Sequence, residues 1–231
     1  MALLMLLAFC LLFPLTILLI VPFAFALGSL NTLLTLPFQM IAVALDKERR
    51  RNHALEHATV NVLEERIGQR LPISGFAEAD GFFVNGVAAQ PAAIMAAAQE
   101  GLQRLQAGER SLAWHPRCGT VIVAGQLISA LTFFAVLFYL KLSLPTLLVA
   151  MVVALLLGRL LAQPLGLLLQ RTLTTRTDVG NLHLDRIEQI MPESLVNVLL
   201  TRGQSALRFR LWTRQDGDEG GSGGPKRWKA Y

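Results

Sequence analysis

The chain has 231 residues, of which 53% are hydrophobic, and a formal net charge of +5. Its mean hydropathy of +0.49 exceeds that of soluble domains, which argues against a soluble enzyme. The positive charge could point to nucleic acid, but it also fits the basic bias of membrane proteins and attraction to anionic lipid headgroups. We therefore expect a lipid bilayer as partner and no nucleic acid.

The N-terminal region is strongly apolar. Residues 2–27 contain no charged side chain, and about 20 such residues suffice to cross the hydrocarbon core as a helix. Residues 32–45 are also apolar, but Pro37 and Gln39 interrupt them, so we favour an interfacial or re-entrant segment there. Residues 24–26 fit a signal cleavage pattern, but no basic region precedes them and the apolar run is too long for a cleaved signal. We predict a transmembrane span followed by a second, membrane-associated segment.

The polar segment 46–118 is predicted to fold as a small α/β unit. Residues 46–70 hold no proline and are rich in helix formers, which predicts a helix. Residues 73–87 place short apolar stretches around Asp-Gly and Asn-Gly pairs, the pattern of a β-hairpin. Pro91 then stands where a helix over residues 92–106 would begin.

Two long apolar runs follow. Residues 112–114 are predicted to form one more strand, which leads directly into the membrane. Residues 119–169 are mostly apolar, with a short break beginning at Lys141 and one charged residue, Arg159, in the second run, and they predict a transmembrane helical hairpin.

The C-terminal segment 170–214 is again polar. Residues 179–187 and 206–213 alternate between apolar and polar side chains, as half-buried strands do. A helix over residues 193–201 is predicted between them. Residues 215–231 are rich in glycine and charge, and they predict a disordered tail.

The distribution of basic residues predicts the orientation of the chain. Basic residues near the ends of spans stay on the cytoplasmic side, and Lys141 is the exception at the far end of the hairpin. The others cluster beside the polar segments: Lys47, Arg49, Arg50, Arg51, Arg104, Arg110, Arg117, Arg171 and Arg176. Cys10 and Cys118 offer no disulfide framework, which suits a reducing compartment. We predict an integral membrane protein of the plasma or thylakoid membrane with its polar segments in the cytoplasm.

Together these elements define the fold class. We predict an α-helical membrane protein with about three transmembrane helices and a small cytoplasmic α/β unit. The hairpin would divide that unit into two stretches of sequence.

The stretch His53-Ala-Leu-Glu56-His57 is an H-x-x-E-H pattern on a predicted helix. Residues four apart on a helix point the same way, so both imidazoles could reach one metal ion. Inverzincin-type metallopeptidases use this arrangement, with the glutamate as general base toward metal-bound water. The pattern predicts His53 and His57 as metal ligands and Glu56 as a catalytic residue.

His115 and Cys118 supply further candidate ligands at the start of the second span. Zinc accepts histidine nitrogen and cysteine thiolate. A site with three protein ligands leaves a position for water, and a site that uses all four residues is closed and structural.

Other interpretations of these residues stay open. His53 and His57 could form a polar stripe with Glu64, held by ion pairs and not by a metal. His115 could belong only to a turn, and Cys118 could be an inert thiol or a nucleophile with a histidine base. His183 lies on the polar face of its predicted strand and is expected to face solvent.

HALEHAT at residues 53–59, together with LAWHPRCGT at 112–120, resembles an integral-membrane family of unassigned function found mainly in cyanobacteria. More broadly, the chain is similar to bacterial membrane proteins regarded as metal-dependent enzymes, whose pattern pairs H-x-x-E-H with a later H-x-R-C-G-T. The resemblance implies a metal site and supplies no substrate. The downstream glutamate ligand of inverzincins has no counterpart that we can assign, so the likeness to that class is confined to the H-x-x-E-H pattern.

Three hypotheses follow for function. The first is a zinc-dependent hydrolase or peptidase at the cytoplasmic membrane surface, with Glu56 as base. The second is a non-enzymatic scaffold or assembly factor for other membrane proteins, with a structural metal held by His53, His57, His115 and Cys118. The third is a membrane protein without metal.

Overall fold

The structure is a computed structural model, and it describes residues 2–86, 89–190 and 208–215. The chain divides into two compact units. Unit 1 comprises residues 1–46 and 114–174, and unit 2 comprises residues 47–113 and 175–231. The two stretches of unit 2 therefore lie on either side of the predicted hairpin in the sequence.

Unit 1 consists of long apolar helices. These are α1 (Ala2–Leu45), α4 (Gly119–Tyr139) and α5 (Leu144–Leu169), and a π-helical turn, η2 (Gln170–Thr174), extends α5. Within the described part of the chain, three helices are long and apolar enough to cross a membrane: Leu12–Leu45, Gly119–Tyr139 and Leu144–Thr174. The number of such helices equals the number of spans that the sequence predicts.

The helix α1 differs from the prediction for the N-terminal region. It runs without a break from Ala2 to Leu45 and includes Pro14, Pro22 and Pro37. A proline in an apolar helix is tolerated when other groups satisfy the freed backbone carbonyls. Residues 32–45, predicted to be an interfacial or re-entrant segment, therefore continue the helix of residues 2–27.

The helices α4 and α5 pack closely through small residues. A Cβ atom added at Gly158 of α5 would lie 1.9 Å from Ser129 Oγ and 2.8 Å from the carbonyl oxygen of Gly125, both on α4. Small side chains of this kind let two membrane helices approach. Farther along α4, the ring of Phe133 packs edge to face against Phe25 of α1, with 5.1 Å between ring centroids. Unit 1 is thus a three-helix assembly.

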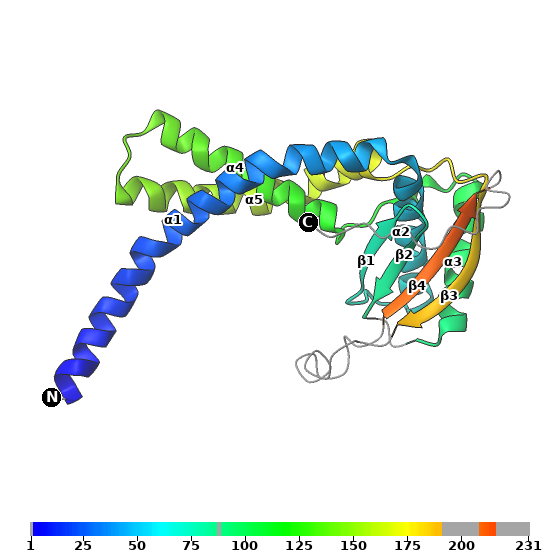
Figure 1. Ribbon diagram of the computed structural model, residues 1–231, viewed down its shortest axis with the longest axis horizontal. Helices are drawn as coiled ribbons and strands as arrows, with labels where there is room; N and C mark the ends of the chain where they lie inside the picture. The colour runs from blue at the N-terminus through cyan, green and yellow to red at the C-terminus, as the bar shows by residue number, and fades with distance from the viewer. Residues whose placement is uncertain (1, 87–88, 191–207, 216–231) are drawn as a thin grey trace. The chain divides into compact units, whose positions relative to one another are not determined.

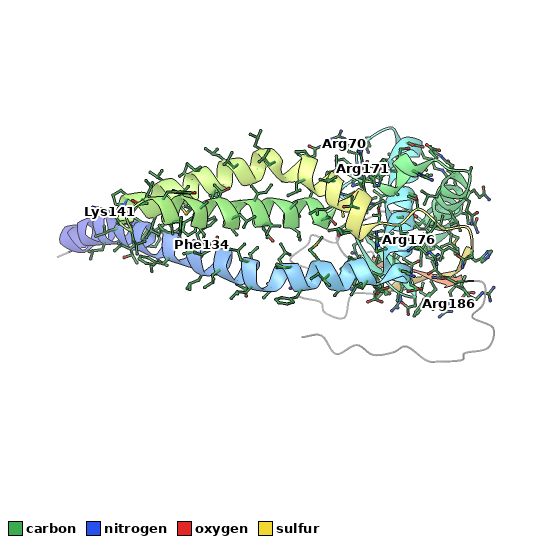
Figure 2. All side chains as sticks on the ribbon, turned by 90° about the horizontal axis from the view of Figure 1, so that it is seen from above. Arg70, Phe134, Lys141, Arg171, Arg176 and Arg186 are labelled. Atoms are coloured by element: carbon green, nitrogen blue, oxygen red, sulfur yellow. The ribbon has the colours of Figure 1, made fainter. Side chains whose placement is uncertain are left out.

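The charged ends of the hairpin are visible in Figure 2. Lys141 lies at the turn between α4 and α5, and Arg171 lies at the other end of α5. The Arg171 guanidinium stacks over the Trp114 ring, 4.4 Å from its centroid. An aromatic ring beside a cation at a helix end is typical of the boundary between lipid and water.

Unit 2 is a four-stranded antiparallel sheet with two helices (Figure 1). The strands β1 (Ser74–Glu78), β2 (Gly81–Asn85), β3 (Leu182–Ile190) and β4 (Arg208–Gln215) lie in the order β1-β2-β4-β3. The helices α2 (Lys47–Ile67) and α3 (Pro91–Gln106) lie on one side of this sheet (Figure 1).

The core of unit 2 lies between the sheet and the helices. Phe82 of β2 is opposite Leu211 of β4, and Val84 is opposite Phe209. All four side chains are buried, as are Leu55 of α2 and Ile94 of α3. The alternation predicted for residues 206–213 is confirmed at positions 209 and 211. Because β4 comes after the hairpin in sequence, the unit is complete only when both stretches of chain are present.

Several predicted boundaries need correction. Residues 112–114 do not form a strand, because residues 110–113 form a short 3-10 helix, η1 (Arg110–Ala113). Its carbonyl groups accept hydrogen bonds from side chains of α2: Asn61 Nδ2 donates to Leu112 O at 2.9 Å. The strand predicted over residues 179–187 begins at Leu182, and its register shifts between Leu184 and Ile187, which disturbs the alternation. The predicted helix over residues 193–201 and the predicted tail beyond Gln215 lie outside the described residues.

Candidate metal centre

The H-x-x-E-H pattern lies in the middle of α2, as predicted. The rings of His53 and His57 face each other, with 4.4 Å between their centroids. This spacing follows from the helix, on which residues four apart lie one above the other. His57 is buried, and His53 is half-buried. Two imidazoles on one helix face are therefore available to a single ion.

A backbone carbonyl fixes the orientation of His57. Its Nδ1 lies 2.7 Å from the carbonyl oxygen of Ala113 in η1. Since a carbonyl can only accept, Nδ1 carries the hydrogen and Nε2 keeps its lone pair. Burial lowers the pKa of His57 to about 4, while the hydrogen bond to Ala113 acts in the opposite direction. His57 is thus a neutral imidazole, the form that binds metals.

Glu56 is a buried carboxylate beside β1. A Cβ atom added at Gly75 would lie 1.9 Å from Glu56 Oε1 and 2.8 Å from its Cγ. Because Glu56 is buried, its side chain has little room to withdraw from such a contact. Glycine at position 75 therefore makes space for the Glu56 side chain.

Buried Asn52 holds α2 in register with the sheet. Its amide Nδ2 donates to the carbonyl oxygens of Glu78 at 2.9 Å and Ala79 at 3.0 Å. Its Oδ1 accepts from Thr213 Oγ1 of β4 at 2.8 Å. These three hydrogen bonds of a fully buried side chain fix the position of the helix turn that carries His53 relative to the strands.

The segment His115–Cys118 belongs to unit 1 and forms a turn. The side chain of Gln170 in the same unit holds this turn. The amide of Gln170, in η2, accepts from the His115 backbone N–H at 2.8 Å and donates to its carbonyl oxygen at 3.0 Å. The same carbonyl accepts from the Cys118 N–H at 3.3 Å. Gln170 is fully buried. This amide therefore clamps the turn that carries Cys118.

Cys118 is the N-cap residue of α4. Its Sγ accepts a hydrogen bond from the Thr120 backbone N–H at 3.4 Å. A helix N-terminus favours a negative group, which suits a thiolate. The Thr120 hydroxyl lies 3.3 Å from that of Thr174, so the sulfur sits beside a polar pair at the end of the hairpin.

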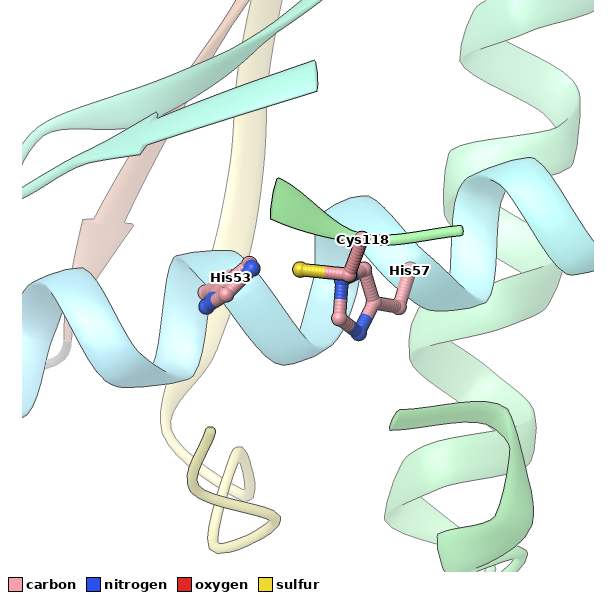
Figure 3. Close-up of side chains that lie close together, drawn as sticks. All are labelled: His53, His57 and Cys118. Atoms are coloured by element: carbon pink, nitrogen blue, oxygen red, sulfur yellow. The ribbon is translucent and has the colours of Figure 1, made fainter. Parts of the chain in front are cut away.

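Three of the four predicted ligands form a group that could hold a metal ion. One ligand atom each from His53, His57 and Cys118 lies within 4.8 Å of the other two (Figure 3). The fourth predicted ligand, His115, is buried but is not a member of this group. His183 is exposed on β3, as predicted.

The competing interpretation of a histidine–glutamate stripe does not fit the helix. Glu64 lies seven residues beyond His57, about 10 Å along the helix axis, and farther still from His53. Its carboxylate accepts from the Leu71 backbone N–H at 2.8 Å. Glu64 therefore serves the loop after α2, too far along the helix for direct ion pairs with the histidines.

The sequence alone did not identify the residues that support this site. Gly75, Asn52, Gln170 and the Ala113 carbonyl all act across long sequence separations. Only Gln170 leaves a recognisable signal, as a lone amide at the end of an apolar run.

Comparisons with known proteins relate the chain to one family and one relative. The family described as a domain of unknown function (DUF6391) matches residues 48–187, which include both motifs and the hairpin. An uncharacterized protein of the cyanobacterium Picosynechococcus is 39% identical over 90 residues, which cover 35% of this chain and 43% of that protein. The chain thus aligns with less than half of that relative's length. No solved structure matches the chain. Because the family match extends over more than half of the sequence, the chain belongs to the DUF6391 family.

Proposed function

We propose that this chain is a membrane-anchored, zinc-dependent hydrolase. The observation that carries the proposal is the group of His53, His57 and Cys118, with the buried carboxylate of Glu56 on the same helix turn as both histidines. Nitrogen and sulfur donors in this combination select zinc over magnesium or calcium, which prefer oxygen.

The side chains fit the requirements of a zinc site. Donor atoms at 2.0 to 2.3 Å from one zinc lie about 3.5 Å apart. A small side-chain rotation is enough to reach that spacing from separations within 4.8 Å. The Ala113 carbonyl orients the His57 ring, as a second partner does for most metal-binding histidines.

Three protein ligands define the chemistry that the site could perform. When bound at such a site, zinc keeps a fourth position for water and lowers the pKa of that water toward 7. Glu56 would take the proton from the attacking water and later deliver it to the leaving group. The substrate would be a molecule that presents a hydrolysable bond at the membrane surface.

A structural metal site is the alternative. Cysteine thiolate is common among the ligands of structural zinc, and His57 is almost fully buried. In that case a fourth protein ligand would close the site, and the protein would serve as a scaffold or assembly factor for other membrane proteins.

Cobalt substitution distinguishes the open hydrolytic site from the closed structural site. Protein loaded with Co²⁺ is expected to show a thiolate-to-cobalt charge-transfer band that Cys118→Ser abolishes. An open coordination position would let azide or a hydroxamate change the visible d–d spectrum. A spectrum that no small ligand alters would favour the closed, structural site and contradict the hydrolase.

We also propose that unit 2 lies on the cytoplasmic side of the membrane. The basic residues beside the spans support this orientation, with Lys141 alone at the far turn (Figure 2). In intact cells a membrane-impermeant maleimide should label Lys141→Cys and should not label His183→Cys. Wild-type protein, which contains Cys10 and Cys118, measures the background labelling of the native cysteines. Labelling of His183→Cys without permeabilisation would reverse the orientation.

A further inference from the structure

Arg159 is the only charged residue in the three long apolar helices. Residues 2–45, 119–139 and 144–169 contain no other charged side chain. At 1.5 Å per residue, Arg159 lies about 22 Å from Leu144 and about 15 Å from Leu169 along α5. Because the hydrocarbon core of a bilayer is about 30 Å thick, Arg159 lies near its middle when α5 crosses a membrane.

The Arg159 side chain lies on the outward side of α5. The inward side, packed within unit 1, carries small buried residues: Ala150, Ala154, Gly158 and Gly166. Arg159 is exposed beside Leu156 and Leu160, the two most exposed large apolar residues of α5, at 65% and 69%. Gln163, one helix turn farther along, is exposed as well. These four outward side chains form what we call the Arg159 face of α5.

The direction of α5 takes the Arg159 side chain away from the nearer end of the helix. Side chains of an α-helix tilt toward its N-terminus, and the N-terminus of α5 lies at the turn that contains Lys141. The guanidinium therefore leaves the helix toward the end that is about 22 Å away. No hydrogen bond or ion pair joins Arg159 or Gln163 to any other residue that the structure describes. An unpaired charge in hydrocarbon costs free energy, which a partner of opposite charge would offset.

We infer that the Arg159 face binds a transmembrane helix of a different protein, and that this helix carries an aspartate or glutamate. A carboxylate accepts two hydrogen bonds from one guanidinium and balances its charge. A second copy of this chain offers no such group, because its own long apolar helices contain no acidic residue. The Gln163 amide adds a group that can hydrogen-bond to the same helix. The inference requires membrane insertion and is independent of the metal centre.

Synthetic helices test the preference for an acidic partner. Full-length protein fused to a fluorescent protein is reconstituted in phosphatidylcholine vesicles with a dye-labelled leucine-alanine transmembrane peptide that has aspartate or leucine at its centre. Energy transfer should show about 10-fold tighter binding of the aspartate peptide, and Arg159→Leu should remove this difference. Arg159→Glu should instead prefer a peptide with a central lysine. Lys141→Leu, the matched control, removes a basic residue at the hairpin turn and should keep the wild-type preference. Equal binding of the aspartate and leucine peptides to wild-type protein would overturn the inference.

Cross-linking in native membranes identifies the occupant of the Arg159 face. Full-length protein with photoreactive benzoylphenylalanine in place of Leu160 is irradiated, and the cross-linked segment is sequenced by mass spectrometry. We expect a transmembrane segment of another protein with an aspartate or glutamate inside its span, and a yield that falls about 10-fold in Arg159→Leu. The same photoreactive residue in place of Leu131, which is exposed on α4, is the control, and its cross-links should not depend on Arg159. Cross-links to lipid alone, to a second copy of this chain or to a helix without an acidic residue would contradict the inference.

Discussion

Glu56→Gln is expected to lower hydrolytic turnover by a factor of about 10² to 10⁴ while the zinc content stays unchanged. The substitution keeps the shape of the side chain and removes only the ability to accept a proton. The assay is zinc-dependent cleavage of a fluorogenic ester and amide panel by detergent-purified protein, with zinc measured on the same samples. Full activity in Glu56→Gln would exclude this residue as the base.

Gly75→Ala offers an independent route to the same carboxylate. The new methyl group would overlap Glu56 Oε1, so the side chain must leave its position, and turnover should fall with zinc still bound. Gly180→Ala is the matched control, since a Cβ atom there has no neighbour within 4 Å. Equal activity of the two glycine variants would contradict the assigned role of Gly75.

Removal of the metal is expected to destabilise the protein strongly. An ion at about 1,000 times its Kd contributes about 4 kcal/mol to the free energy of unfolding. For a chain of this size, 1 kcal/mol shifts Tm by about 2 to 4 °C, so excess chelator should lower Tm by about 8 to 16 °C. Thermal unfolding of the detergent-solubilised protein, followed by tryptophan fluorescence, measures the shift.

Variants of the two cysteines show whether metal binding at the candidate site causes this stabilisation. Cys118→Ala should unfold near the Tm of chelated wild-type protein and respond little to chelator. Cys10→Ala, whose residue is exposed on α1, should behave as wild type. A chelator that leaves the wild-type Tm unchanged would show that no ion contributes to folding.

Local patterns predicted most of the fold. The hairpin of β1 and β2 follows from the Asp80-Gly81 pair at its turn, and Gly86, directly after β2, adopts a φ of 84° that favours glycine. Pro91 begins α3 because its fixed φ suits a first helical position. Misjudged boundaries arose where distant contacts override local preference. η1 turns its carbonyls to α2, and β3 begins only at Leu182 and shifts register between Leu184 and Ile187.

The candidate site also has features that the sequence predicts and features that it does not predict. The pairing of His53 with His57 depends on helix periodicity alone, so it could be predicted. The partner of His57 is a carbonyl from a 3-10 helix more than fifty residues away, which no local pattern encodes. The turn that begins at His115 likewise depends on the amide of Gln170, which lies 55 residues farther along the chain.

Metal content of the purified protein tests the central claim most directly. Inductively coupled plasma mass spectrometry of detergent-purified wild type, prepared without chelator, should give about one equivalent of zinc. His53→Ala/His57→Ala should lose that zinc, and His183→Ala, which removes an exposed histidine, should keep it. Wild-type protein without metal, or a double variant that retains a full equivalent, would contradict the proposed centre.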